Sequence, residues 1–369
     1  MTEQQLAWLR KFVEIPGPSG YEESVQQQWI ESLPQEALTI SQDVHGNVAA
    51  RYRGTDSRFT VLLGGHADEI ALVVHYISDD GMLYCKSIGG VDPAVLPAQP
   101  VRILTANGVV HGIIGAPAVH LLSEEERGKA RKLHELWIDI GAADKAMAEQ
   151  LVQPGDPVIV GGDFLPLAGS RAAARCFDNR VGIFIVSQIL NRLVEQQISL
   201  PFDVVGLSTV QEETSMTGIK TAGFALNPDV GIIYDVMVAT DFPGVDQKKF
   251  GVIKVGAGVG IARGVRTDRR LADLLIQLAK EADIPYQVEI ERGWSSTDAD
   301  PLTDTRGGVA TTILSVATRY LHTSWEVLDL QDVEATIQLT LVLLQSPRFV
   351  EYLHQIGQQR HAQDTNSAT

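Results

Sequence analysis

The stretch that decides the fold is residues 178–210, which read DNRVGIFIVSQILNRLVEQQISLPFDVVGLSTV. Its first part predicts a helix over 179–195, and the mostly apolar run over 202–210 predicts a strand. The alternation continues with strands at 230–234 and 309–316 and with helices at 267–282 and 330–344. Strands that alternate with long helices are typical of α/β folds, so we expect a three-layer domain with a central mixed sheet.

The N-terminal residues add to the same domain. Apolar residues at helical spacing predict helices around 6–13 and 25–29, and the run Pro16–Gly20 forces a loop between them. Two further strands are predicted at 47–52 and 59–64. The α/β domain is therefore built from both ends of the chain.

The middle of the chain has a different pattern of predicted secondary structure. Short β-rich pieces are separated by turn signals such as Asp79-Asp80-Gly81, which predicts a small barrel or sandwich. The predicted strands are 70–77, 82–87, 101–104, 109–114 and 136–140. We therefore expect a discontinuous catalytic domain of residues 1–68 and 164–369, with an inserted β-barrel-like domain at 69–163.

Composition narrows the classes of partner. The chain has 369 residues and a formal net charge of −16, so its average surface repels nucleic acid and anionic lipid headgroups. It contains no run of about 18 apolar residues that could span a membrane, and its N-terminus lacks a signal-peptide pattern. These features favour a cytoplasmic protein. The two cysteines, Cys85 and Cys176, are too few for a disulfide framework, and we expect buried free thiols.

Side chains that bind metals follow several predicted strands. These are His66 and Asp68 after 59–64, Glu212 and Glu213 after 202–210, Asp235 after 230–234, and His322 beyond 309–316. Asp178 joins them at the N-terminal end of the helix predicted over 179–195. The carboxyl ends of parallel strands meet at one edge of a sheet, where ligands bind. We therefore expect these side chains to converge in space.

Two histidines and several carboxylates form a mixed nitrogen and oxygen donor set, which suits zinc, cobalt or manganese. So many carboxylates could hold two ions about 3.5–4 Å apart, with one carboxylate bridging them. Glu212 and Glu213 are adjacent and cannot face one ion equally, so one can ligate while the other takes a proton from water. The pattern predicts hydrolysis.

Each element taken alone also fits a structural role. A His-x-Asp pair commonly forms a hydrogen bond, paired glutamates commonly lie on a solvated face, and His322 could be a core histidine. Asp235 is more unusual, because a carboxylate that ends a buried run is costly unless it is paired or bound. The joint pattern favours a metal site, because chance alone rarely places so many potential ligands at successive strand ends.

At these residues the chain resembles the TET-type dinuclear metallo-aminopeptidases, the glutamyl and deblocking aminopeptidase group of peptidase clan MH. The resemblance covers nearly the whole length, in order and in spacing. The matching stretches are Pro16-Gly17-Pro18-Ser19-Gly20-Tyr21-Glu22, His66-Ala67-Asp68-Glu69-Ile70, Ser87-Ile88-Gly89-Gly90, Ile138-Asp139-Ile140-Gly141-Ala142, Asp178-Asn179-Arg180-Val181-Gly182, Val210-Gln211-Glu212-Glu213, Tyr234-Asp235-Val236, Thr297-Asp298-Ala299 and Arg319-Tyr320-Leu321-His322.

The resemblance implies a role for each candidate. His66 and Asp235 would hold one divalent ion, Glu213 and His322 the other, and Asp178 would bridge both and precede a cis peptide to Asn179. Asp68 would orient His66, and Glu212 would be the general base. The resemblance also implies short peptide substrates, a dimerisation role for the inserted domain, and a homododecamer assembled from dimers.

The chain departs from the family pattern at two places. The glutamate pair continues as Thr214-Ser215-Met216-Thr217-Gly218 instead of Val-Gly-Leu-Arg-Gly, and Ser296 stands where the family often has glycine before Thr-Asp-Ala. Neither change touches a proposed ligand. They bear on substrate preference and shell packing, and the resemblance gives Asp298 a place near the substrate but no chemical role.

Three functions remain open from the sequence. The first is a metal-dependent aminopeptidase that removes N-terminal residues from short peptides. The second is a deacylase or glycan hydrolase on the same scaffold, although glycoside cleavage by paired carboxylates does not need two histidine ligands. The third is a shell-forming scaffold without activity. The side chain that an aminopeptidase of this sequence would prefer is not predicted.

Overall fold

The computed structural model of the chain describes residues 1–367. Its largest element is an eight-stranded sheet. In spatial order the strands are β1 (Thr39–Gln42), β2 (Val48–Tyr52), β12 (Asp203–Thr209), β3 (Thr60–His66), β13 (Val230–Val238), β16 (Ala310–Thr318), β14 (Val259–Gly264) and β15 (Tyr286–Glu291). The four central strands β12, β3, β13 and β16 are parallel, whereas β2 and β14 pair with them antiparallel. The expected mixed sheet is confirmed.

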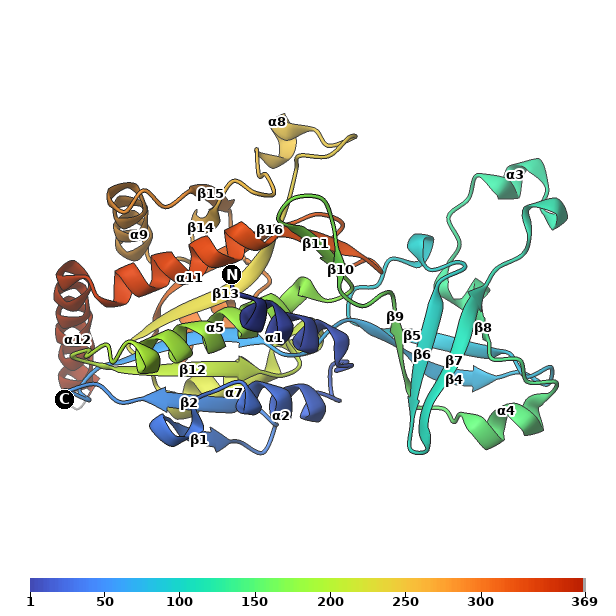
Figure 1. Cartoon of the computed structure of the whole chain (residues 1–369), viewed down its shortest axis with the longest axis horizontal. Helices are drawn as coiled ribbons and strands as arrows, with labels where there is room; N and C mark the ends of the chain where they lie inside the picture. The colour runs from blue at the N-terminus through green and yellow to red at the C-terminus, as the bar shows by residue number, and fades with distance from the viewer. Residues whose placement is uncertain (368–369) are drawn as a thin grey trace.

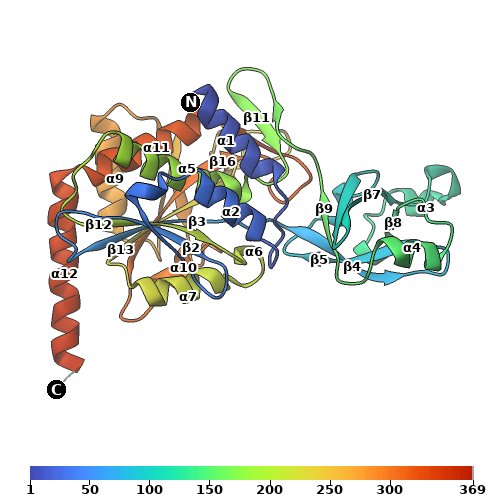
Figure 2. The same ribbon diagram turned by 60° about the horizontal axis from the view of Figure 1, so that its bottom comes forward.

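Helices cover both faces of this sheet, which confirms the three-layer architecture (Figure 2). One face carries α1 (Glu3–Glu14), α2 (Glu23–Glu31), α5 (Phe177–Glu195), α9 (Arg269–Glu281), α11 (Leu330–Leu344) and α12 (Pro347–Ser367). The other face carries α7 (Thr217–Leu226) and α10 (Ala299–Thr303). Almost every residue of α5 is buried, because this helix lies between the sheet and the outer helices α1 and α11.

Two expected helices begin later than their apolar pattern suggests. The helix expected over 267–282 begins at Arg269, because the Asp268 carboxylate caps it by accepting from the backbone N–H groups of Arg270 and Leu271. In α5, Asp178 and Asn179 have non-helical backbone angles. The regular part of that helix therefore starts after Asn179, one residue later than expected.

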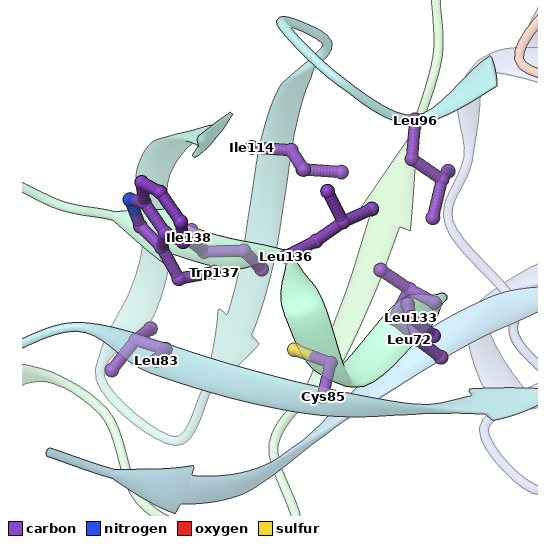
Figure 3. Close-up of a pocket in the computed structure, with 9 residues that line it drawn as sticks. All are labelled: Leu72, Leu83, Cys85, Leu96, Ile114, Leu133, Leu136, Trp137 and Ile138. Carbon is purple, nitrogen blue, oxygen red and sulfur yellow. The ribbon is translucent and has the colours of Figure 1, made fainter. Parts of the chain in front are cut away.

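The middle of the chain forms a closed six-stranded barrel beside the large sheet (Figure 1). Its strands are β4 (Ala71–Ile77), β5 (Leu83–Ile88), β6 (Pro100–Thr105), β7 (Gly108–Gly115), β8 (Trp137–Asp139) and β9 (Pro157–Val160). Apolar side chains from β4, β5, β7 and β8 converge inside it, among them Leu72, Leu83, Ile114 and Ile138 (Figure 3). The barrel therefore has an apolar core of its own.

Smaller elements complete the two units. A three-stranded sheet consists of β10 (Leu165–Pro166), β11 (Arg171–Ala174) and β17 (Glu326–Asp329). Short helices are α3 (Glu124–Arg127), α4 (Lys145–Leu151), α6 (Glu212–Ser215) and α8 (Gln247–Phe250), with 3-10 turns at Gln35–Ala37, Pro93–Val95, Val119–Leu121 and Leu133–Glu135. Cys85 and Cys176 are free thiols, as expected, but only Cys176 is buried, whereas Cys85 is half-buried. None of the helices in the described part of the chain combines the length and apolar character needed to cross a bilayer.

Candidate metal centre

Three of the predicted ligands meet at the carboxyl edge of the sheet. His66 ends β3, Asp235 lies in the neighbouring strand β13, and Asp178 lies at the start of α5. One ligand atom from each lies within 4.8 Å of the others, and all three residues are buried. We call this group the deep triad. It arises because β3 and β13 pair in parallel, with Ile233 opposite Gly64, although β13 continues past Asp235 to Val238 instead of ending before it.

A second group shares Asp178 with the first. Asp178, Glu213 and His322 also bring ligand atoms within 4.8 Å of one another, and we call them the outer triad. The His322 Nε2 atom lies 3.2 Å from Asp178 Oδ2 and 3.4 Å from Glu213 Oε2, whereas His66 Nε2 lies 3.1 Å from Asp178 Oδ1. Asp178 thus directs one carboxylate oxygen to each triad, which is the arrangement that a bridging ligand requires.

Small residues allow α5 to approach the end of β3. A Cβ atom added at Gly65 would lie 2.7 Å from the backbone carbon of Gly182 in α5. Strand and helix backbones are therefore in direct contact beside His66, which places Asp178 within reach of that histidine. The peptide bond between Asp178 and Asn179 is cis, in agreement with the resemblance.

Asp68 connects His66 to the glutamate pair. Its Oδ1 atom lies 3.3 Å from His66 Nδ1, and its two oxygens accept from the backbone N–H groups of Glu212 at 3.0 Å and Glu213 at 3.1 Å. The Ser19 hydroxyl, from the Pro16–Gly20 loop, donates to the same carboxylate at 2.5 Å. This arrangement fixes the His66 ring and the α6 turn with respect to each other.

Glu212 lies next to both triads without belonging to either. Its Oε2 atom is 3.7 Å from His66 Nε2, and the residue is buried. Burial and the charges of nearby carboxylates raise the pKa of the Glu212 carboxyl to about 10, against the opposing effect of His66. The Glu212 carboxyl is therefore placed beside the triads, within reach of a proton released there.

The electrostatics of the cluster fit bound cations. Burial raises the pKa of Glu213 and of Asp235 well above the usual range, and the nearby charge of Asp178 adds to both effects. These carboxyls therefore cannot all ionise at low cost without added positive charge. Imidazole and carboxylate donors suit zinc, cobalt and manganese, so the residues present fit two divalent ions.

Glu326 is a residue of this centre that the sequence analysis missed. One of its carboxylate oxygens accepts from the Asp178 N–H at 2.9 Å, and the other accepts from the His322 N–H at 3.3 Å. The side chain is buried and therefore holds two ligand-bearing segments together. Its position four residues after His322 was visible in the sequence, but nothing local distinguishes it from a surface glutamate.

Two more residues take notable positions. Asp298 is buried near Glu212 and accepts from the Thr209 hydroxyl, and its Oδ1 atom has no hydrogen-bond partner among the described residues. Ser296, which stands where the family often has glycine, has a φ of 60°, in the left-handed region that glycine adopts at least cost. The expected site therefore extends to the Ser296–Asp298 segment.

The inserted barrel also reaches the outer triad. The loop after β5 brings Gly90 against the His322 ring, which forms a hydrogen bond with the Gly90 backbone. A Cβ atom at Gly90 would lie 2.9 Å from His322 Nδ1, so the contact needs a residue without a side chain. This explains why Gly89-Gly90 belongs to the recognised pattern.

Comparison with known proteins identifies the family. A model of the M42 glutamyl aminopeptidase family matches residues 46–339 of the chain. This protein belongs to the M42 family. M42 proteins are metal-dependent peptidases, and the two triads are the candidate metal-binding residues of this member.

Relatives of this M42 protein agree with the family over the full fold. The lysyl aminopeptidase of Pyrococcus furiosus is 32% identical over 350 residues, which cover 93% of this chain and 98% of that protein. The structure of a TET aminopeptidase from a marine sediment archaeon of the Thaumarchaeota has a TM-score of 0.89 at 32% identity and covers 95% of this chain and 99% of its own. The Pyrococcus horikoshii TET1 peptidase is described as assembling into a tetrahedron or a large octahedral shell. Its structure has a TM-score of 0.81 at 29% identity, and the match covers 92% of this chain and 99% of that chain. The resemblance to TET-type peptidases is therefore confirmed.

Proposed function

We propose that this M42 protein is an aminopeptidase that removes N-terminal residues from short peptides with the help of two divalent ions. The observation that carries the proposal is the pair of triads joined through Asp178, with Glu212 beside them. In this assignment His66 and Asp235 hold one ion, Glu213 and His322 hold the other, and Asp178 bridges both. Zinc or cobalt suits the donor set best, and manganese is compatible with it.

The bound ions would make a water molecule more acidic and polarise the scissile carbonyl group. The residues of the chain perform the proton transfers. Glu212 takes a proton from the attacking water and delivers it to the nitrogen of the departing peptide. Asp68 acts through His66, whose ring it orients, and not on the substrate.

The decisive experiment separates metal binding from proton transfer. Glu212→Gln is expected to retain both ions, because Glu212 belongs to neither triad, and to lower kcat by about 10²–10⁴-fold. Metal analysis and hydrolysis of aminoacyl anilides measure the two properties on the same sample. Glu36→Gln, a change at an exposed glutamate, serves as the matched control. Near-normal turnover of Glu212→Gln would refute the assigned role.

A substrate panel tests the alternatives of a deacylase and a glycan hydrolase. Aminoacyl anilides, acetylated amino acids and soluble cellulose distinguish the three reactions. We expect hydrolysis of the anilides only, because a free amino group completes the interactions of an acidic site and a glycan offers no such cation. A protein that binds less than about one ion per chain after metal resupply would instead be a scaffold without activity.

We infer that residues 69–163 mediate dimerisation and that dimers assemble into a dodecamer. The barrel exposes apolar side chains that a partner subunit could cover, including Val109 (51% exposed), Ile113 (50%) and Leu121 (80%). The shells described for the Pyrococcus horikoshii relative support the same inference. Light scattering would give a mass near twelve chains, whereas a monomeric mass would contradict the assembly.

A further inference from the structure

A large cavity lies beside the candidate metal centre and has no role in the chemistry described above. It contains about 820 Å³ of space open to water. The end of β13, the segment that carries α8, and β15 with the residues that follow it form its walls, and the α8 segment projects from this part of the molecule (Figure 1). Most of the lining is apolar, including Val238, Val288 and Trp294.

The cavity is continuous with the deep triad along the sheet. Ala239 lines the cavity and lies four residues after Asp235, just past the end of β13. Ser315 on β16 is the register partner of Asp235, so their backbones are about 4.8 Å apart. The Ser315 hydroxyl donates to Glu289 Oε2 at 2.8 Å, and Glu289 lines the cavity. One serine therefore separates the cavity wall from a proposed ligand.

These residues share one face of the sheet. One apolar cluster on this face contains Ile233, Ile313 and Ala262. Asp235 lies two residues after Ile233, and Ser315 lies two residues after Ile313. Side chains two residues apart on a strand point to the same face, so Asp235 and Ser315 lie on the face of this cluster. Glu289 is the register partner of Ala262, and its carboxyl reaches across β14 to Ser315. The Glu289 carboxyl thus lies on the same face as the metal centre.

Glu289 lacks a cationic partner. No lysine, arginine or histidine among residues 1–359 lies within ion-pair distance of it, and Ser315 provides its recorded hydrogen bond. Desolvation and, to a smaller extent, the nearby charge of Glu291 together raise the pKa of its carboxyl to about 7. A half-buried carboxylate without a cationic partner is stabilised when a cation enters beside it.

The cations of the lining lie at the rim. Lys249 and Arg292 are exposed, and the Lys249 Nζ atom sits 4.7 Å from the centre of the Phe250 ring. An exposed ammonium group remains hydrated and interacts weakly over distance. The least exposed charged groups of the lining are therefore the carboxylates, while most of its walls are apolar.

We propose that this cavity receives the side chain of the N-terminal substrate residue, and that Glu289 selects lysine or arginine. The inference rests on the proposed aminopeptidase function. The apolar walls pack against the methylene groups of a long basic side chain, and its charged end pairs with the Glu289 carboxylate. Ser315 is a positioning residue, because it holds that carboxylate through its hydroxyl.

The test compares lysyl, leucyl and glutamyl anilides with metal-replete protein. Wild-type protein is expected to prefer the lysyl substrate, and Glu289→Gln is expected to lower kcat/KM for lysyl relative to leucyl anilide by about 10–100-fold. Glu291→Gln, at the neighbouring carboxyl of the same wall, is expected to change the ratio less. Equal losses in both variants would indicate a diffuse negative field and overturn the role of Glu289.

Two measurements keep the inference testable if Glu289→Gln does not fold. Free lysine should inhibit wild-type hydrolysis of leucyl anilide more strongly than norleucine, which has a similar stem without the charge. A preference for glutamyl anilide, or equal inhibition by the two amino acids, would overturn the inference while leaving the aminopeptidase intact.

Failure of the proposed function gives a different result. In that case no anilide is cleaved, and binding of amino acids to the cavity is measured by thermal unfolding alone. Lysine is then expected to raise Tm more than norleucine does, and equal shifts would overturn the selection of basic side chains.

Discussion

The deep and outer triads share Asp178 but differ in how the fold holds their other members. His66 and Asp235 lie in adjacent parallel strands, and the His66 side chain is 2% exposed. Glu213 lies in a single helical turn, and His322 lies in a loop after β16 with its side chain 36% exposed. The comparison teaches that one sheet edge can carry a rigid ligand set and an adjustable one side by side.

The backbone reinforces this difference. His322 has a φ of 59°, a left-handed conformation that is costly for a residue with a side chain, and Glu326 and Gly90 hold it in place. The deep triad needs no comparable support, because β3 and β13 are paired with neighbours on both sides. We therefore expect the outer ion to depend on more distant residues than the deep ion does.

The largest effect is expected at the shared ligand. Asp178→Asn removes the charge that serves both triads, so metal content should fall below about one ion per chain and hydrolysis should be lost. Metal analysis after resupply measures this, with exposed Asp283→Asn as the control. Loss of one ion only would show that the two triads do not share Asp178.

A smaller and selective effect is expected at Glu326. A glutamine at this position keeps one acceptor oxygen where the carboxylate uses two, so the His322 or Asp178 segment loses an anchor. Because Asp178 serves both triads and His322 only the outer one, Glu326→Gln should weaken the outer metal-binding phase in calorimetry by about 10–100-fold and the deep phase by less. Equal weakening of both phases would contradict the separation of the triads, and exposed Glu351→Gln is the matched control.

The smallest effect concerns the order in which ions leave. Because His322 is far more exposed than His66, a chelator should remove the outer ion first, and metal loss should follow two phases. His322→Ala should abolish the fast phase and retain the slow one. A single phase in wild-type protein would remove the distinction between a rigid and an adjustable site.

Much of the fold was predictable because it follows local periodicity. The helix over 179–195 and the strands around 59–64 and 230–234 have uninterrupted apolar patterns, and all are present. Strands β14 and β15 were not predicted. β14 contains two glycines, whereas YQVEIE in β15 alternates apolar and polar residues and carries a strand signal that was overlooked. The wall that holds Glu289 was therefore missed although its strand was predictable.

The candidate site was predictable to a similar extent. His66, Asp178, Glu212, Glu213, Asp235 and His322 were selected by chemistry and by their places after strands, and the fold brings them together. The roles assigned to them remain proposals. Glu326 and Glu289 were missed, since each acts through a partner that is distant along the chain or on another strand.

The sequence by itself determined the layered α/β architecture, the insertion of a β-rich unit and the residue types of the metal centre, because periodicity and donor chemistry are local properties. Only the tertiary structure decided that Asp178 divides its two oxygens between His66 and His322. It also decided that Glu289 faces a cavity next to Asp235. Such distances depend on strand order, register and close backbone contact, which no local pattern encodes.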